Sequence, residues 1–155
     1  MQRLYLDVAS RWPLREDARQ AISDASSIAD ADPTRSHLEG RMAADLLERA
    51  TATVAEPIGV AESSLIWTSG GTESVHLAVL GSARAEIQRG GTRRHLVCSA
   101  VEHSSVLRAC ERLRDEHGFE LDVVGVDGSG VIDPERVAAV LRSDTLAVHL
   151  QHANH

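Results

Sequence analysis

The sequence predicts an α/β fold in which a mostly parallel sheet carries helices on both faces. Over the second half of the chain, short apolar runs of strand character alternate with runs of helical length. Apolar residues make up 43% of the 155 residues and aromatic residues only 3%, which indicates an aliphatic core. Alternation of this kind places parallel strands beside one another, with helices crossing between them on either face.

The first part of the chain is predicted to be helical. Residues 14–30 form one amphipathic pattern, and residues 36–58 form a second, in which apolar side chains recur every four residues. The polar loop between them, residues 31–37, contains an Asp-Pro pair that favours a break. Pro57 marks the end of the second helix, because proline ends or kinks a helical pattern.

The rest of the chain is expected to alternate between strands and helices. The expected strands are residues 63–69, 95–100, 120–126 and 145–151, and the expected helices are residues 72–89, 103–118 and 133–141. Gly118 is a natural residue to close a helix, because glycine adopts the left-handed conformation there. Asp133 and Pro134 are a typical cap and first residue of the last helix.

Composition excludes several functions. The formal net charge of −7 argues against binding to a nucleic-acid backbone, which needs a basic face. No apolar run approaches the length of about 18 residues that a membrane span requires. The N-terminal residues lack the apolar core of a signal peptide, so the expected location is cytoplasmic. Cys98 and Cys110 lie in apolar strand-like and helix-like runs and are interpreted as reduced structural thiols.

Two further features of the composition bear on chemistry. All 16 basic residues other than histidine are arginine, and the sequence contains no lysine. Arginine stays protonated, so no side chain of this sequence can bind a carbonyl cofactor covalently through an amine. Three histidines follow one another at spacing three at the end of the chain, but the run reads as a strand and a loop, so no metal site is expected.

The most informative segment is residues 67–80, WTSGGTESVHLAVL. An apolar run leads into a glycine pair, and a helical pattern follows. Gly70, Gly71 and Thr72 would then hold a phosphate, because the helix start offers free N–H groups and a positive dipole end. The alternative is an ordinary helix start, in which Ser69 or Thr72 caps and Glu73 favours the first turn. The segment matches neither the P-loop nor the GxGxxG pattern.

The same segment resembles the cysteine desulfurases of the class V aminotransferase group, whose stretch reads Thr-Ser-Gly-(Ala/Gly)-Thr-Glu-(Ser/Gly)-x-Asn-Leu-Ala. Further stretches resemble that family in the same order and at nearly the same spacing. They are YLDVAS (residues 5–10), DPTRSH (32–37), VEHSSVL (101–107), GSGVIDPERV (128–137) and DTLAVHLQHANH (144–155). Together they cover the whole chain.

The resemblance implies a fold and a set of roles. It identifies residues 1–155 as the N-terminal part of an incomplete pyridoxal 5'-phosphate (PLP) transferase large domain of the aminotransferase type, beginning with a helical segment. Gly71 and Thr72 match the residues that bind the cofactor phosphate. His103 matches the histidine that stacks on the pyridine ring and transfers protons. Asn154 matches the asparagine near the pyridine oxygen and the substrate carboxylate.

The family's second half carries groups that this sequence lacks. They are an Asp for the pyridine nitrogen, the Lys that binds the cofactor, an Arg for the substrate carboxylate and a loop with the catalytic Cys. The chain also ends as its last strand reaches the carboxyl edge of the expected sheet, where ligands bind. It is therefore expected to be the N-terminal subunit of a split desulfurase and to be an enzyme only within a complex. A C-terminal-half subunit would supply the missing groups and share the PLP, in a dimer of half-chain pairs. L-cysteine would be the substrate, alanine a product, and a further protein the sulfur acceptor.

Several residues depart from the family pattern and leave alternatives open. In the segment Ser10-Arg11-Trp12, bulky residues stand where the family has two small hydroxyl residues. His76, His155 and Asp32 each stand where the family has an asparagine. One alternative is a non-catalytic half that acts as a scaffold or binding subunit. Another is a split selenocysteine lyase or C–S lyase, which the loop in the missing half would distinguish from a desulfurase.

Overall fold

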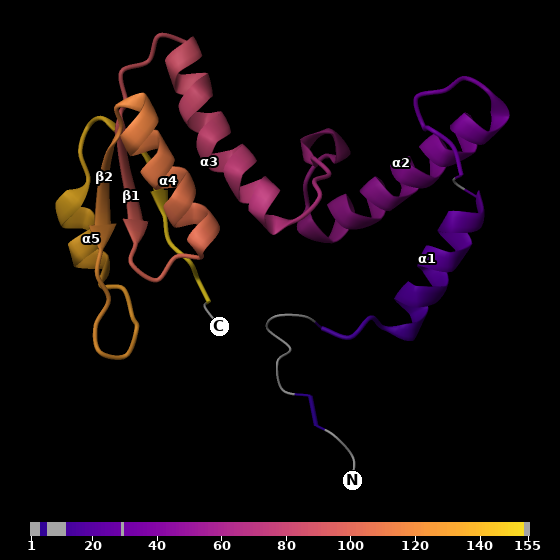
Figure 1. Ribbon diagram of the computed structural model, residues 1–155, viewed down its shortest axis with the longest axis horizontal. Helices are drawn as coiled ribbons and strands as arrows, with labels where there is room; N and C mark the ends of the chain where they lie inside the picture. Colours follow the sequence, from indigo (N-terminus) through magenta and orange to yellow (C-terminus); the bar gives the residue numbers. More distant parts are fainter. Residues whose placement is uncertain (1–3, 6–11, 29, 154–155) are drawn as a thin grey trace. The chain divides into compact units, whose positions relative to one another are not determined.

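The computed structural model describes residues 4–5, 12–28 and 30–153 (Figure 1). The chain forms two compact units, Met1–Trp67 and Thr68–His155. The first is helical and the second contains a sheet. Among the described residues, no helix combines the length and the hydrophobicity that crossing a bilayer requires.

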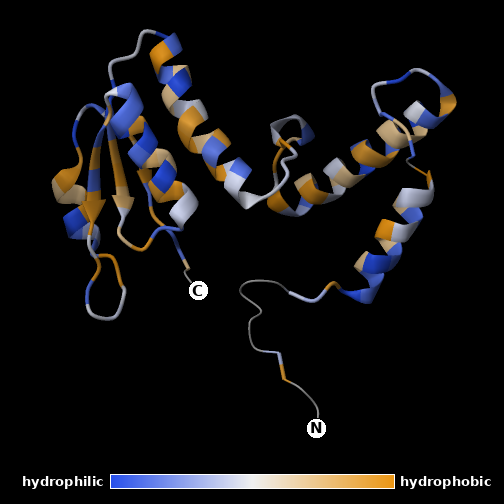
Figure 2. Ribbon diagram, viewed as in Figure 1, coloured by the Kyte–Doolittle hydropathy of each residue, from blue (hydrophilic) through white to orange (hydrophobic). Residues whose placement is uncertain are grey.

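The first unit consists of helix α1 (Glu16–Ile28), helix α2 (Leu38–Ile58) and the short 3-10 turn η1 (Glu62–Ser64). Both predicted helices are thus confirmed. Pro57 lies in the last turn of α2, and Gly59 ends the helix with a left-handed φ of 72°. Figure 2 shows hydrophobic residues at several turns of α2, yet few of its side chains are buried.

The strand predicted at residues 63–69 is wrong. The 3-10 turn η1 occupies its beginning, and no strand is assigned to the rest of the segment in the part of the chain that the structure describes. Trp67 instead donates its indole N–H to the hydroxyl of Thr51 at 3.0 Å, and Ile66 is 72% exposed. An apolar run becomes a strand only when another strand pairs with it, and among the described residues no strand pairs with this one.

The second unit alternates helices and strands as predicted. Its elements are α3 (Gly71–Gln88), β1 (His95–Ser99), α4 (Ser104–His117), β2 (Glu120–Val124), α5 (Pro134–Val140) and β3 (Thr145–His149). The three strands are parallel, in the order β2-β1-β3. Helices α3 and α4 pack together on one face of this sheet, and α5 covers the other face (Figure 1). The predicted fold class is confirmed.

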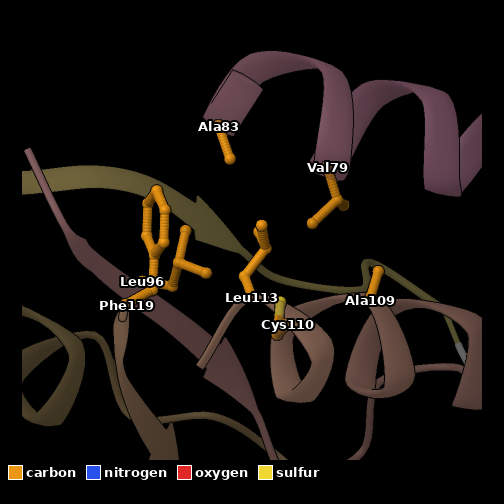
Figure 3. Close-up of a cluster of buried hydrophobic side chains, with 7 residues drawn as sticks. All are labelled: Val79, Ala83, Leu96, Ala109, Cys110, Leu113 and Phe119. Atoms are coloured by element: carbon orange, nitrogen blue, oxygen red, sulfur yellow. The ribbon is translucent and has the colours of Figure 1, made fainter. Parts of the chain in front are cut away.

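The core follows from the central position of β1, which is buried along its whole length. Leu96 faces the cluster that α3 and α4 form with the sheet (Figure 3). The next residue, Val97, faces the opposite way and packs against Val137 of α5. This alternation is what a strand between two helical layers requires.

Both cysteines are free and fully buried, as expected. Cys98 lies on β1 and Cys110 on α4, where it joins the core cluster. The hydrogen bond with Cys98 and burial both raise the pKa of the Cys110 thiol. This thiol therefore stays protonated at neutral pH and serves packing.

The helix ends of the second unit follow the predicted chemistry. Asp133 accepts a hydrogen bond from the backbone N–H of Glu135 at 2.9 Å, and Pro134 is the first helical residue of α5. Gly118 ends α4 with a left-handed φ of 69°. Each signal is local in the chain, which is why the sequence identifies it.

His95 joins the three strands where they begin. The backbone N–H of Arg142 donates to the hydroxyl of Thr145 at 2.8 Å, so that hydroxyl is free to donate to His95 Nδ1, also at 2.8 Å. Nε2 then carries the ring proton and donates to Asp122 Oδ2 at 3.1 Å. The fully buried imidazole thus bonds to β2 and β3 from the central strand.

Candidate functional site

The start of α3 presents unused backbone donors. The cap residue is Gly70, whose backbone is extended and which has no side chain to cap the helix. The first helical bond runs from the N–H of Ser74 to the carbonyl oxygen of Gly70, at 3.1 Å. The N–H groups before Ser74 therefore have no partner within the helix, and the positive end of the dipole lies with them.

Neither Ser69 nor Thr72 caps this helix, so the hydroxyl cap of the alternative interpretation is not present. Glu73 folds back instead, and its Oε2 accepts from both the N–H and the hydroxyl of Ser69, each at 2.6 Å. These bonds lower the pKa of Glu73, first through the Ser69 hydroxyl and then through its N–H. The cap position itself is held by Gly70, and the side chain of Ser69 bonds to Glu73 and not to the helix start.

The two residues predicted to bind a phosphate are open to solvent. Gly71 and Thr72 are both exposed. A Cβ built on Gly71 would meet no atom within 4 Å, so the backbone has free space on the side where a ligand would approach. Within the described residues, the hydroxyl of Thr72 makes no hydrogen bond and remains available as a donor.

His103 lies in the turn between β1 and α4, where it is the N-cap of α4. Its Nδ1 accepts from the backbone N–H of Ser105 at 3.1 Å and from the Ser105 hydroxyl at 2.8 Å. The neutral ring therefore carries its proton on Nε2, which has no partner in the part of the chain that the structure describes. The ring is exposed, so this N–H faces the outside.

The fold brings these residues to one edge of the sheet. Helices α3 and α4 both run opposite to the parallel strands, so their first turns lie at the carboxyl ends of the strands (Figure 1). Gly71, Thr72 and His103 consequently share that edge, where ligands bind in open α/β sheets. The remaining predicted residue, Asn154, lies outside the described residues.

Glu102 has a larger part in this edge than its sequence position suggested. Its Oε1 accepts from the Ser99 hydroxyl at 2.7 Å and from the backbone N–H of Gln151. In the sequence, a carboxylate next to a helix start is most simply explained by its interaction with the helix dipole, and for that reason this contact was not predicted. The spacing Ser-x-x-Glu between Ser99 and Glu102 is the feature of the sequence that could have indicated the bond between these two side chains.

A second histidine lies at the same edge. His149 pairs with Cys98 in the parallel ladder, so both side chains lie on the α3/α4 face. Its Nε2 is buried without a hydrogen-bond partner among the described residues. Burial lowers the pKa of His149, and the negative charge of Glu102 acts against that shift. The ring is therefore neutral at pH 7.

The residues that depart from the family pattern lie in different environments, and some lie outside the described residues. His76 lies on α3, partly buried, and its Nε2 has no hydrogen-bond partner in the described chain. Trp12 is 68% exposed. Ser10, Arg11 and His155 lie outside the described residues. The described residues also contain no group of three or more metal-ligating side chains arranged for an ion.

Known proteins resemble this chain along its full length. The family model of class-V aminotransferases matches residues 4–155. The cysteine desulfurase IscS of Dictyoglomus turgidum is 36% identical over 151 residues, which are 97% of this chain and 37% of that protein.

Two solved structures share the fold. DndA from Streptomyces lividans has a TM-score of 0.80 at 35% identity, over 98% of this chain and 42% of its own. SspA in complex with cysteine has a TM-score of 0.82 at 26% identity, over 94% of this chain and 41% of its own. The chain thus spans about two fifths of the length of these relatives.

Proposed function

Because this chain belongs to the class V aminotransferase family, we propose that it forms one part of the PLP site of a cysteine desulfurase. Residues 1–155 would be the N-terminal part of the large domain. The observation that supports this best is the shared edge, where the first turn of α3 and His103 lie together. A phosphate-binding helix start and an imidazole at one sheet edge suit a phosphorylated pyridine.

The phosphate end of PLP fits the start of α3. Gly71 supplies a backbone N–H that a ligand can approach closely, and Thr72 supplies an N–H and an unused hydroxyl. Glu73 is ionised in the same turn, but its carboxylate accepts hydrogen bonds from the N–H and the hydroxyl of Ser69 and is directed at that residue. Gly71 and Thr72 would therefore carry the phosphate.

His103 suits the ring end. Bound PLP would draw electrons from the substrate's α-carbon. The exposed imidazole holds its proton at Nε2, because Ser105 occupies Nδ1. The ring would stack on the cofactor and move a proton through Nε2. Asn154 would bind the pyridine oxygen or the substrate carboxylate.

The covalent attachment of PLP does not fit these residues. The sequence has no lysine, and arginine cannot replace it. We therefore propose that polypeptide outside these 155 residues supplies the lysine and the catalytic cysteine, as a partner subunit that shares the cofactor. The two buried cysteines of this chain are not candidates, because neither thiol is accessible. Two such pairs would form a dimer, because members of the family are dimers.

The reaction would take sulfur from L-cysteine, pass it to an acceptor protein and leave alanine, and it would take place in the cytoplasm. The desulfurase names of the relatives support this choice. The choice between this reaction and selenocysteine or C–S lysis depends on the loop that would carry the catalytic cysteine, which this sequence does not contain.

A scaffold function is the second candidate, and His76 favours it. In the family pattern an asparagine stands at this position, whereas here the ring Nε2 is buried without a partner among the described residues. A non-catalytic subunit tolerates such a change more readily than a working site does. Under this alternative the helix start of α3 would bind no cofactor.

Absorbance spectroscopy with added PLP separates the two functions. The spectrum is recorded on the chain alone and on the chain purified with the proteins that accompany it. We expect a cofactor band of covalently bound PLP only in the second sample, together with alanine release from L-cysteine. A second sample with neither band nor alanine would favour the scaffold, and a single polypeptide on a denaturing gel would refute the split enzyme.

A further inference from the structure

Glu102 connects two chain segments that each lead to a predicted site residue. His103 follows it directly, and the segment that it contacts at Gln151 leads to Asn154. We propose that Glu102 is a positioning residue, whose carboxylate fastens the exit of β3 to the exit of β1 and so fixes His103 relative to the segment before Asn154. The role of this contact in a cofactor site rests on the proposed function, whereas the contact itself does not depend on it.

The first argument is the end of the strand ladder. Pairing between β1 and β3 ends at Cys98 and His149. Beyond that point β1 stays with β2, because the N–H of Ala100 donates to the carbonyl oxygen of Val124 at 2.8 Å. The N–H of Gln151 therefore has no strand acceptor, and the carboxylate of Glu102 accepts it instead.

The second argument is the charge of the acceptor. One oxygen of Glu102 accepts both from the Ser99 hydroxyl and from the backbone N–H of Gln151. An ionised carboxylate accepts two donors at one oxygen well, and such bonds are about twice as strong as neutral ones. An amide at this position would keep the shape and lose the charge.

The third argument is the continuation of the network. The side-chain amide of Gln151 donates to the carbonyl oxygen of Ala153 at 2.6 Å. A chain of contacts thus runs from Ser99 through Glu102 and Gln151 to the residue before Asn154. On the other side, His103 is fixed by its bonds to Ser105. A shift of Glu102 would separate the two halves of this edge.

The test uses the full chain without cofactor and the variant Glu102→Gln. Amide hydrogen exchange at Gln151 is expected to become about tenfold faster, because a neutral amide oxygen accepts the bond more weakly than the carboxylate does. The pKa of His149, measured by NMR, is expected to fall, because the nearby anion that raises it is removed. A side chain that acted only through its shape, which glutamine keeps, would leave that pKa unchanged.

Glu116→Gln is the matched control, because it removes the same charge from the far, exposed end of α4, where Glu116 pairs with Arg112. It should change neither measurement. Glu102→Asp keeps the charge and shortens the reach, so it should speed exchange at Gln151 and leave the pKa of His149 close to its original value. It also carries the test if Glu102→Gln does not fold.

Two results would overturn the proposal. One is exchange at Gln151 within about twofold of the unchanged chain in both Glu102 variants, since a lost charge-assisted bond predicts more. The other is a pKa of His149 that Glu102→Gln does not move. Both readouts are taken without PLP. A chain that never binds PLP would therefore refute the proposed function and leave this inference standing.

Discussion

The two units differ in what their helices bury. Helix α1 buries no side chain among its described residues, and α2 buries three small residues, whereas α3 and α4 enclose a continuous core with the sheet. Local ion pairs support α1, such as Arg19 with Glu16 at 3.3 Å. A helix can therefore form in this chain without burying an apolar face, and only in the second unit do the helices also bury one.

The exposed apolar side chains make the same contrast visible. The first unit leaves many large ones at its surface, among them Ile22, Leu38, Met42, Leu47 and Ile58. The second unit also exposes some, such as Leu77 and Val131, but it has a buried cluster around Leu96 (Figure 3). Stability should accordingly be concentrated in the second unit, and the substitutions below test that in order of expected size.

The largest effect is expected from Leu96→Ala. Leu96 is 1% exposed at the centre of the core cluster, so the cavity should cost about 2–5 kcal/mol of unfolding free energy. Ile22→Ala in α1 is the control, because Ile22 is 56% exposed and its loss should cost about 0.5 kcal/mol or less. Denaturant unfolding followed by circular dichroism measures both. Equal losses would abolish the contrast between the units.

A smaller, pH-dependent effect is expected from Glu86→Gln. The guanidinium of Arg93 donates to both carboxylate oxygens of Glu86, at 3.2 and 3.1 Å. The hydrogen bond from the Arg93 side chain is the main cause that lowers the pKa of Glu86. Its ionised form is thus favoured by folding, and it contributes stability above the unfolded pKa of about 4.3.

The stability difference between the original chain and Glu86→Gln should therefore be full at pH 7. It should shrink as the pH falls through the lowered folded pKa and vanish below it. Thermal unfolding at a series of pH values measures this. Glu16→Gln in α1 is the counterpart, since its exposed pair with Arg19 contributes little at any pH. A pH-independent difference for Glu86→Gln would contradict the assignment.

Two glycines in the same conformation offer a matched comparison of the units. Gly118 ends α4 with φ 69°, and Gly59 ends α2 with φ 72°. Alanine at either position is strained by about 1 kcal/mol. Gly118→Ala should lower the unfolding free energy of the whole second unit, whereas Gly59→Ala should only fray α2. Hydrogen exchange distinguishes the two, and global destabilisation by Gly59→Ala would show that α2 shares the stability of the sheet.

The smallest effects on stability are expected within α3. Gly71→Ala meets open space and should leave the fold unchanged, while Gly81→Ala should stabilise the helix interior by about 0.5–1 kcal/mol. For the affinity for PLP we expect the opposite order of effects. Gly71→Ala should weaken PLP binding about tenfold by obstructing the phosphate, and Gly81→Ala should not. Equilibrium dialysis with PLP measures this. Equal affinities would remove Gly71 from the site.

The sequence predicted those parts of the fold that depend on neighbouring residues. Gly118, Asp133 and Pro134 act within one helical turn, so their effects can be read directly from the chain. The strand expected at residues 63–69 failed for the opposite reason. An apolar run carries no information about whether a partner strand is present.

The site shows the same division. Gly71 and Thr72 were singled out because a glycine and a hydroxyl at a helix start suit a phosphate, and His103 was added by the resemblance to the desulfurases. The fold places the starts of α3 and α4 at one edge of the sheet. The contact between Glu102 and Gln151 was missed because the two residues lie 49 positions apart in the chain. The unpartnered Nε2 of His149 was missed as well, since burial of one atom depends on the packing of the whole layer.

The contacts of His95 also imply an order in which the second unit assembles. Its ring bonds to Asp122, 27 residues along the chain, and to Thr145, 50 residues along. Closing the shorter loop costs less entropy, and β2 leaves the ribosome before β3. We therefore expect β1, α4 and β2 to assemble first during synthesis, and β3 to add last to a preformed edge.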